Sequence, residues 1–199
     1  MTAPTNNNNN NSNCFSSHSS CHHHVGVFDD YLKHCHEGCS RYCDWDRLLF
    51  ACQQNKLDLV QHLITEGGVD PSYSNPMKQS ALHIAARYGH IECLEYLLQN
   101  IPSDRLTDVI NSKNRLSGAT PLHCCLQKAL NEHGDDLLRS RLVACALRLV
   151  QVGADLTMVD AMGKTPLDYW KENFEPFSQN DQGSHIFLLG QELQSKVTV

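Results

Sequence analysis

The stretch SALHIAARYGHIECLEYLLQN, residues 80–100, decides the predicted fold. Apolar residues within 82–86 share one face of a short predicted helix. Gly89 follows this helix, and glycine commonly ends a helix because it readily adopts the left-handed conformation. A second helix is predicted from residue 91, where apolar residues recur on one face up to residue 98. The stretch therefore predicts a helix-turn-helix unit, which cannot bury both of its apolar faces alone.

The same pattern recurs along the chain. Residues 120–123 (TPLH) and 165–168 (TPLD) match residues 80–83 (SALH). Serine and threonine suit the N-cap of a helix, and proline suits its first turn. Apolar residues at 48–52 and 57–64 occupy the matching places one repeat earlier. The sequence therefore predicts stacked repeats, each of which covers the apolar face of its neighbour.

These residues resemble the ankyrin repeat family. The segments SALHIAARYGHIECLEYLL, GATPLHCCL, VGADL and GKTPLD carry the resemblance. It implies an all-α repeat solenoid of stacked ankyrin-type helix-turn-helix units with β-turn or hairpin connections. The outer repeats depart from the family pattern, as end units that expose one face to water often do. We expect four repeats, at about 46–78, 79–117, 118–162 and 163–194.

The rest of the chain predicts two further segments. Residues 1–26 are low-complexity and rich in Asn, Ser and His, so we expect a disordered tail. Residues 27–45 place apolar side chains and cysteines at helical spacing, which predicts a helical N-terminal cap on a repeat domain at 46–199. Extra polar residues at about 100–107 and 131–140 are expected to loop out of the repeats.

Composition and charge disfavour several classes of function. The 199 residues carry a formal net charge of −6, so the basic footprint of a general nucleic-acid binder is missing. No apolar run approaches the ~18 residues of a membrane-spanning helix. The first residues lack the apolar core of a cleaved signal peptide. We therefore predict an intracellular monomer, in the cytoplasm, the nucleus or both, that binds neither nucleic acid nor membrane.

Two histidines at matching repeat positions are the first candidates for chemistry. The family resemblance implies that His83 and His123 hydrogen-bond the neighbouring turn and tie the repeats together. Asp168 replaces this histidine in the last repeat, which is expected to weaken that tie. The sequence contains no phosphate-binding glycine loop, no GxSxG and no HExxH. We therefore predict no catalytic residues, no enzymatic activity and no cofactor.

The cysteines are the second candidates. Cys124, Cys125 and Cys145 fall within predicted repeat helices, so we expect them to pack in the core as small apolar side chains. An N-terminal cluster leaves an alternative function open, namely a metal-binding or metal-responsive protein. Its spacing matches no zinc signature and includes no CxxC pair, so we assign no metal site. The cluster comprises Cys14, His18, Cys21, His22, His23, His24, His34, Cys35, His36, Cys39 and Cys43.

The predicted function is protein-protein recognition without catalysis, as an adaptor, inhibitor or assembly factor. The resemblance implies that the partner, another protein, contacts the turn tips and the exposed side of each first helix. The stretches 70–88, 108–128 and 155–171 together hold seven Lys or Arg and five Asp or Glu, which favours a partner with a neutral or acidic patch. The turn candidates are Pro76, Met77, Gln79, Leu116, Ser117, Ala119, Ala161, Met162 and Lys164. The helix candidates are Gln53, Gln54, Arg87, Tyr88, Gln127 and Lys128.

Overall fold

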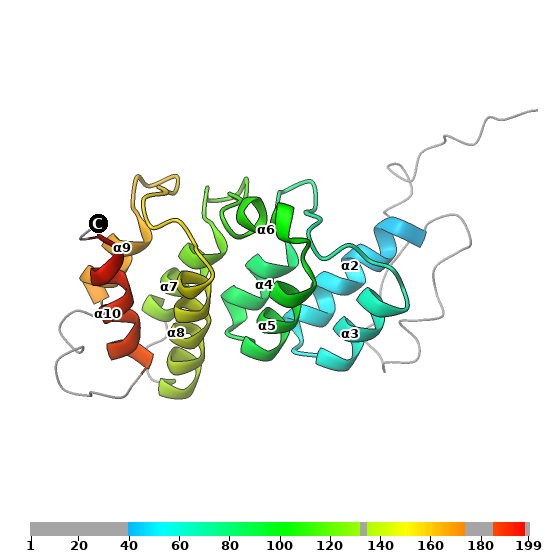
Figure 1. Ribbon diagram of the computed structural model, residues 1–199, viewed down its shortest axis with the longest axis horizontal. Coiled ribbons are helices and arrows are strands. Elements are labelled where there is room, and N and C mark those ends of the chain that lie inside the picture. The colour runs from blue at the N-terminus through cyan, green and yellow to red at the C-terminus, as the bar shows by residue number, and fades with distance from the viewer. Residues whose placement is uncertain (1–39, 132–134, 174–184, 198–199) are drawn as a thin grey trace, which may run out of the picture. The chain divides into compact units, whose positions relative to one another are not determined.

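The computed structural model describes residues 40–131, 135–173 and 185–197. The chain divides into two compact units, Met1–Cys43 and Asp44–Val199. In the second unit the helices follow one another in pairs along a row (Figure 1). The pairs are α2 (Ser40–Gln53) with α3 (Leu57–Thr65), α4 (Ala81–Tyr88) with α5 (Ile91–Asn100), α7 (Pro121–Asn131) with α8 (Asp136–Gln151), and α9 (Pro166–Asn173) with α10 (His185–Val197).

Helices of neighbouring pairs pack against one another. The first helices α4, α7 and α9 are in consecutive contact, and so are the second helices α3, α5, α8 and α10. Leucines on facing sides of these helices are almost fully buried and build one continuous core. Examples are Leu82, Leu97, Leu122, Leu142 and Leu193. The predicted all-α repeat solenoid is confirmed in the part of the chain that the structure describes.

Local sequence sets the start of α4. Ser80 is its N-cap, and its hydroxyl accepts a hydrogen bond from the backbone N–H of His83. The His83 side chain accepts the N–H of Ser80 in return, which completes a capping box. The helix ends at Tyr88, immediately before Gly89, as the sequence predicted.

The first extra segment is not a loop. Residues 103–110 form an additional helix, α6 (Ser103–Ile110), so the predicted looping out of about 100–107 is wrong. Val109 and Ile110 are buried, and α6 is therefore amphipathic despite its polar composition. Arg105 of α6 also pairs with Asp70, with 2.7 Å between Nη1 and Oδ2.

The second extra segment is also partly helical. Residues 136–140, predicted to loop out, belong to α8, while residues 132–134 lie outside the described residues. Asp135 caps this helix, because its Oδ1 accepts the backbone N–H of Leu138 at 2.8 Å. α8 therefore begins within the predicted loop, and its first residues occupy positions 136–140 of that segment.

Removal of this cap provides a direct test. Asp135→Ala is expected to lower the free energy of unfolding by about 1 kcal/mol, because the N–H of Leu138 loses its acceptor. Asp135→Asn is the matched control, since asparagine caps helices about as well as aspartate. Urea unfolding followed by circular dichroism measures both variants. Equal losses in the two variants would contradict the capping role.

The N-terminal predictions mostly concern residues that the structure does not describe. The tail at 1–26 and residues 27–39 of the expected cap lie outside the described residues. α2 runs without interruption from Ser40 to Gln53, across the predicted boundary at residue 45. The proposed domain limits therefore stay predictions. None of the helices described has both the length and the apolar character needed to cross a membrane.

Candidate functional site

Two buried histidines join each first helix to the next turn. His83 is 1% exposed, and its Nδ1 accepts the N–H of Ser80, which leaves the ring proton on Nε2. From there the ring donates to the backbone oxygens of Ser112 at 3.1 Å and Ala119 at 3.2 Å. His123 repeats the arrangement and reaches the oxygen of Lys164 at 3.1 Å. The predicted structural role of both histidines is confirmed.

Asp168 forms the hydrogen bonds within the N-cap that His83 and His123 form, but within the described part of the chain it does not form the bonds to the next repeat. Its Oδ2 accepts the backbone N–H of Thr165 at 2.8 Å and the Thr165 hydroxyl at 2.7 Å. Both bonds lie within the cap of its own helix. A short carboxylate therefore keeps the N-cap closed without the second ring nitrogen that His83 and His123 use to reach another repeat.

The turns before α4, α7 and α9 are closed in a similar way, although the turn before α7 is one residue longer than the other two. A backbone hydrogen bond closes each of them, from Asn75 to the oxygen of Gln79, from Asn114 to that of Ala119, and from Asp160 to that of Lys164. Each turn also contains one residue with positive φ, namely Lys78 at 53°, Gly118 at 63° and Gly163 at 74°. The turn tips line one edge of the row of helix pairs, along the top of Figure 1.

Neighbouring tips are bonded directly to one another. The N–H of Arg115 donates to the oxygen of Met77 at 2.9 Å, and its guanidinium donates to the oxygen of Pro76 at 3.0 Å. One repeat further on, the N–H of Ala161 donates to the oxygen of Ser117 at 2.9 Å. The tips therefore form one continuous edge, which we call the tip edge and define as residues 72–79, 112–118 and 157–164.

Large apolar side chains project from the tip edge. Met77 is 50% exposed, Leu116 is 63% exposed and Met162 is 75% exposed. Tyr73 and Val159 are also exposed on this edge. Each turn thus presents at least one apolar side chain to solvent, and exposed apolar groups gathered in this way mark interaction sites.

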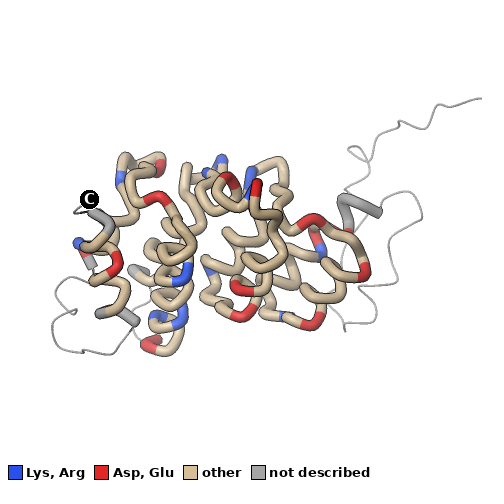
Figure 2. The backbone as a smooth tube through the Cα atoms, viewed as in Figure 1, with Lys and Arg blue, Asp and Glu red and all other residues tan. Residues whose placement is uncertain are grey.

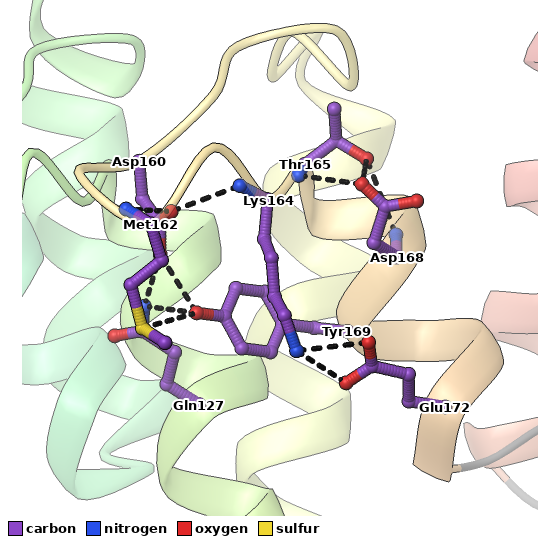
Figure 3. A network of polar contacts seen from close by, with 8 residues as sticks. All are labelled: Gln127, Asp160, Met162, Lys164, Thr165, Asp168, Tyr169 and Glu172. Carbon is purple, nitrogen blue, oxygen red and sulfur yellow. Dashed lines mark hydrogen bonds and ion pairs between the residues drawn. The ribbon is translucent and has the colours of Figure 1, made fainter.

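A polar network fixes the last tip against the first helices (Figure 3). The Tyr169 hydroxyl donates to Oδ2 of Asp160 at 2.7 Å, and Gln127 donates to the same oxygen at 2.9 Å. The backbone N–H groups of Met162 and Lys164 donate to Oδ1 at 2.8 and 3.0 Å. Although burial opposes ionisation, these hydrogen bonds lower the pKa of Asp160, so the group stays a carboxylate and is a poor proton donor.

The Lys164 side chain completes this arrangement. Its Nζ lies 2.7 Å from Oε2 of Glu172 and 5.3 Å from the centre of the Tyr169 ring. The hydrogen bond to Glu172 raises the pKa of Lys164. Glu172 therefore neutralises the ammonium group, and the network positions Met162 without presenting a free charge of its own.

The structure separates the predicted contact residues into two groups. The tip candidates lie at the N-terminal ends of the first helices, whereas Gln53, Gln54, Arg87 and Tyr88 lie at their C-terminal ends. The eight residues of α4 span about 12 Å between these ends. Eight candidates are exposed, namely Gln53, Gln54, Pro76, Met77, Arg87, Leu116, Ala161 and Met162. Six are partly buried, namely Gln79, Tyr88, Ser117, Gln127, Lys128 and Lys164.

Ala119 does not belong to an accessible surface. Its side chain is 0% exposed, because the residue directly follows the tip and leads into α7. Its backbone oxygen is also engaged by the His83 ring. The prediction that Ala119 is available to a partner is therefore wrong for its side chain.

The cysteines of the repeats belong to the core. Cys124 is 7% exposed, while Cys125 and Cys145 are 0% exposed, and all three are free thiols. Burial raises the pKa of Cys124 and of Cys145 to about 12, so both remain protonated at neutral pH. Their predicted packing role is confirmed. The candidate metal-binding cluster of residues 14–43 lies outside the described side chains, and no group of three or more potential ligands occurs among those that are described.

Comparison with known families agrees with the repeat geometry. Residues 48–138 match the family model described as ankyrin repeats (3 copies). The chain contains ankyrin repeats. Such repeats generally mediate protein-protein interaction. The match extends from α2 into the start of α8, and α9 and α10 continue the same packing beyond it.

Several curated proteins are similar to part of this chain. An ankyrin repeat-containing protein of Saccharomyces cerevisiae is 28% identical over 134 residues, which cover 62% of this chain and 67% of the yeast protein. The SMC5-SMC6 complex localization factor protein 1 of Bos taurus and that of Homo sapiens are each 29% identical over 127 residues. These alignments cover 60% of this chain but 10% of each localization factor.

Two features of the site escaped sequence reasoning. The bonds between tips join residues that are 38 and 44 positions apart, so no local pattern reveals them. Tyr73 and Val159 also lay outside the predicted set, although both are exposed on the tip edge. Tyr73 lies five residues before Lys78 and Val159 lies four residues before Gly163, so the two residues share no fixed position in their turns that the sequence could have indicated.

Proposed function

We propose that this protein is a non-catalytic protein-protein interaction module, acting as an adaptor, an inhibitor or an assembly factor. The observation that carries the proposal is the continuous tip edge with Met77, Leu116 and Met162 exposed along it. Stacked repeats offer extended surfaces that are suited to recognition. The C-terminal ends of the first helices, with the exposed Arg87 and the partly buried Tyr88, provide a second contact region.

The names of the relatives support an adaptor or assembly role more closely than an inhibitory one. Two relatives are named as localization factors of a protein complex, although the shared segment is 10% of their length. We propose that this chain likewise acts by holding a protein partner. Action inside the cell, in the cytoplasm or the nucleus, as a monomer and without nucleic acid or membrane, is part of the proposal.

Affinity capture from native lysate tests the proposal. The immobilised full-length protein is compared with the triple variant Met77→Ser/Leu116→Ser/Met162→Ser. Leu137→Ser is the matched control, because Leu137 is 64% exposed on α8 and lies outside the tip edge. We expect specific proteins that the control retains and the triple variant loses, with equal circular dichroism spectra. Equal retention by all three proteins would contradict binding through the tip edge.

A second variant tests the far ends of the first helices. Arg87→Glu/Tyr88→Ala changes the second contact region and leaves the tip edge intact. Loss of the same partners from this variant would extend the surface along the first helices. Full retention would limit the surface to the tip edge.

A further inference from the structure

The turn before α4 carries an unusual residue. Lys78 has a φ of 53°, a conformation that the two equivalent turns assign to Gly118 and Gly163. A side chain in this left-handed region is unfavourable, because its Cβ approaches the backbone. Strained residues of this kind are concentrated at functional sites. Lys78 is therefore an exposed side chain at a position where glycine would fit the turn better.

The accessible charge of the tip edge is positive. Lys78 and Arg115 are exposed, and Lys113 is partly exposed while its ammonium group donates to the oxygen of Val159. Figure 2 shows blue segments on each of these turn loops. The acidic residue within the edge, Asp160, is 7% exposed and accepts four hydrogen bonds.

The positive groups flank the exposed apolar side chains. Lys78 is adjacent to Met77 in the chain, and Arg115 is adjacent to Leu116. The bond between the N–H of Arg115 and the oxygen of Met77 brings these two pairs together. Methionine side chains are flexible and polarisable, so they adapt to varied apolar contacts. The combination favours a ligand that carries both acidic and apolar groups.

We propose that the tip edge binds an acidic, extended segment of the partner protein whose apolar side chains contact Met77, Leu116 and Met162. This inference rests on the interaction function proposed above and specifies the chemistry of the partner. Directly packed helices lie about 8–10 Å apart, which sets a similar distance between neighbouring tips. An extended chain in the polyproline II conformation has three residues per turn and rises about 3.1 Å per residue, so one apolar side chain at every third position lies on one face and matches the tips.

Selection from a random 12-residue peptide library displayed on phage tests the inference. The bait is the full-length protein, and enriched peptides are synthesised and measured by fluorescence anisotropy. We expect peptides with aliphatic residues among Asp and Glu, and weaker binding as salt is raised, because screening reduces the attraction. Lys78→Glu/Arg115→Glu is expected to weaken binding on the order of tenfold. Lys56→Glu reverses one charge at an exposed position between α2 and α3, outside the tip edge, and as the control it is expected to bind as wild type.

Lys78→Gly separates binding from folding. This variant removes the charge and relieves the strained conformation, so its melting temperature is expected to rise by about 2–4 °C. Its affinity for the enriched peptides is expected to fall. A variant that is more stable and yet binds less tightly cannot owe its loss of binding to misfolding. An unchanged affinity would overturn the role of Lys78.

The outcomes distinguish this inference from the proposed function. Neutral or basic peptides that require the Met77, Leu116 and Met162 side chains would overturn the acidic partner and leave the interaction function intact. Peptides that bind the serine triple variant as well as wild type would overturn the tip edge as the site of both proposals. An absence of enriched peptides would overturn the proposal that the tip edge binds an extended segment. The interaction function would still be tested by capture from lysate.

Discussion

Replacing His83 with alanine is expected to lower the free energy of unfolding by about 3–5 kcal/mol. The backbone oxygens of Ser112 and Ala119 would lose the ring Nε2–H as donor, and the N–H of Ser80 would lose its acceptor. Each buried polar group left without a partner costs about 1–3 kcal/mol. One substitution would therefore weaken both the cap of α4 and its tie to the next repeat.

Urea unfolding at neutral pH measures this effect. His62→Ala is the matched control, because the His62 side chain is 48% exposed and pairs with the exposed Glu66. We expect the control to change the free energy of unfolding by less than about 1 kcal/mol. A loss below about 1 kcal/mol in His83→Ala would show that the ring bonds contribute little.

Acidification from pH 7 to pH 4 is expected to remove about 3 kcal/mol of stability through His83 alone. Burial lowers the pKa of His83 from 6.5 to about 4, against the hydrogen bonds to Ala119 and Ser112. The unfolded chain therefore binds more protons than the folded chain between these pH values. This histidine contributes its stability above pH 6.5 and loses it progressively as the pH falls toward 4.

Other titratable groups also affect the free energy of unfolding as the pH falls from 7 to 4. Burial also lowers the pKa of His123 and of His90, so both add to the loss. Hydrogen bonds lower the pKa of Asp160 and of Asp168 below 3.8, so their contribution is lost only in more acidic solution. The histidines therefore dominate the decline between pH 6.5 and pH 4.

Urea unfolding at several pH values between 7.5 and 4 tests this prediction. The free energy of unfolding of wild type should fall steadily below pH 6.5. His83→Ala should give a flatter profile, because the group with the largest pKa difference is gone. Parallel profiles for the two proteins would contradict the link between His83 and acid sensitivity.

The sequence by itself determined the repeating unit and the places where its helices begin and end. Ser80, His83 and Gly89 act within ten residues of one another, so the cap and the end of α4 follow from local spacing. The apolar period of 3.6 residues likewise predicted the faces that the core buries. The roles of His83 and His123 were implied by the family resemblance, and the role of the buried cysteines was indicated by their places in the predicted helices.

Only the tertiary structure decided the features that depend on distant parts of the chain. α6 forms because Val109 and Ile110 find a buried place against the repeats, which a polar local composition does not indicate. Ala119 is enclosed by packing around the start of α7, although its turn lies at the surface. The tip edge arises from bonds between residues about 40 positions apart. Burial and contacts of this kind arise only when the repeats stack, so the sequence of a single repeat cannot predict them.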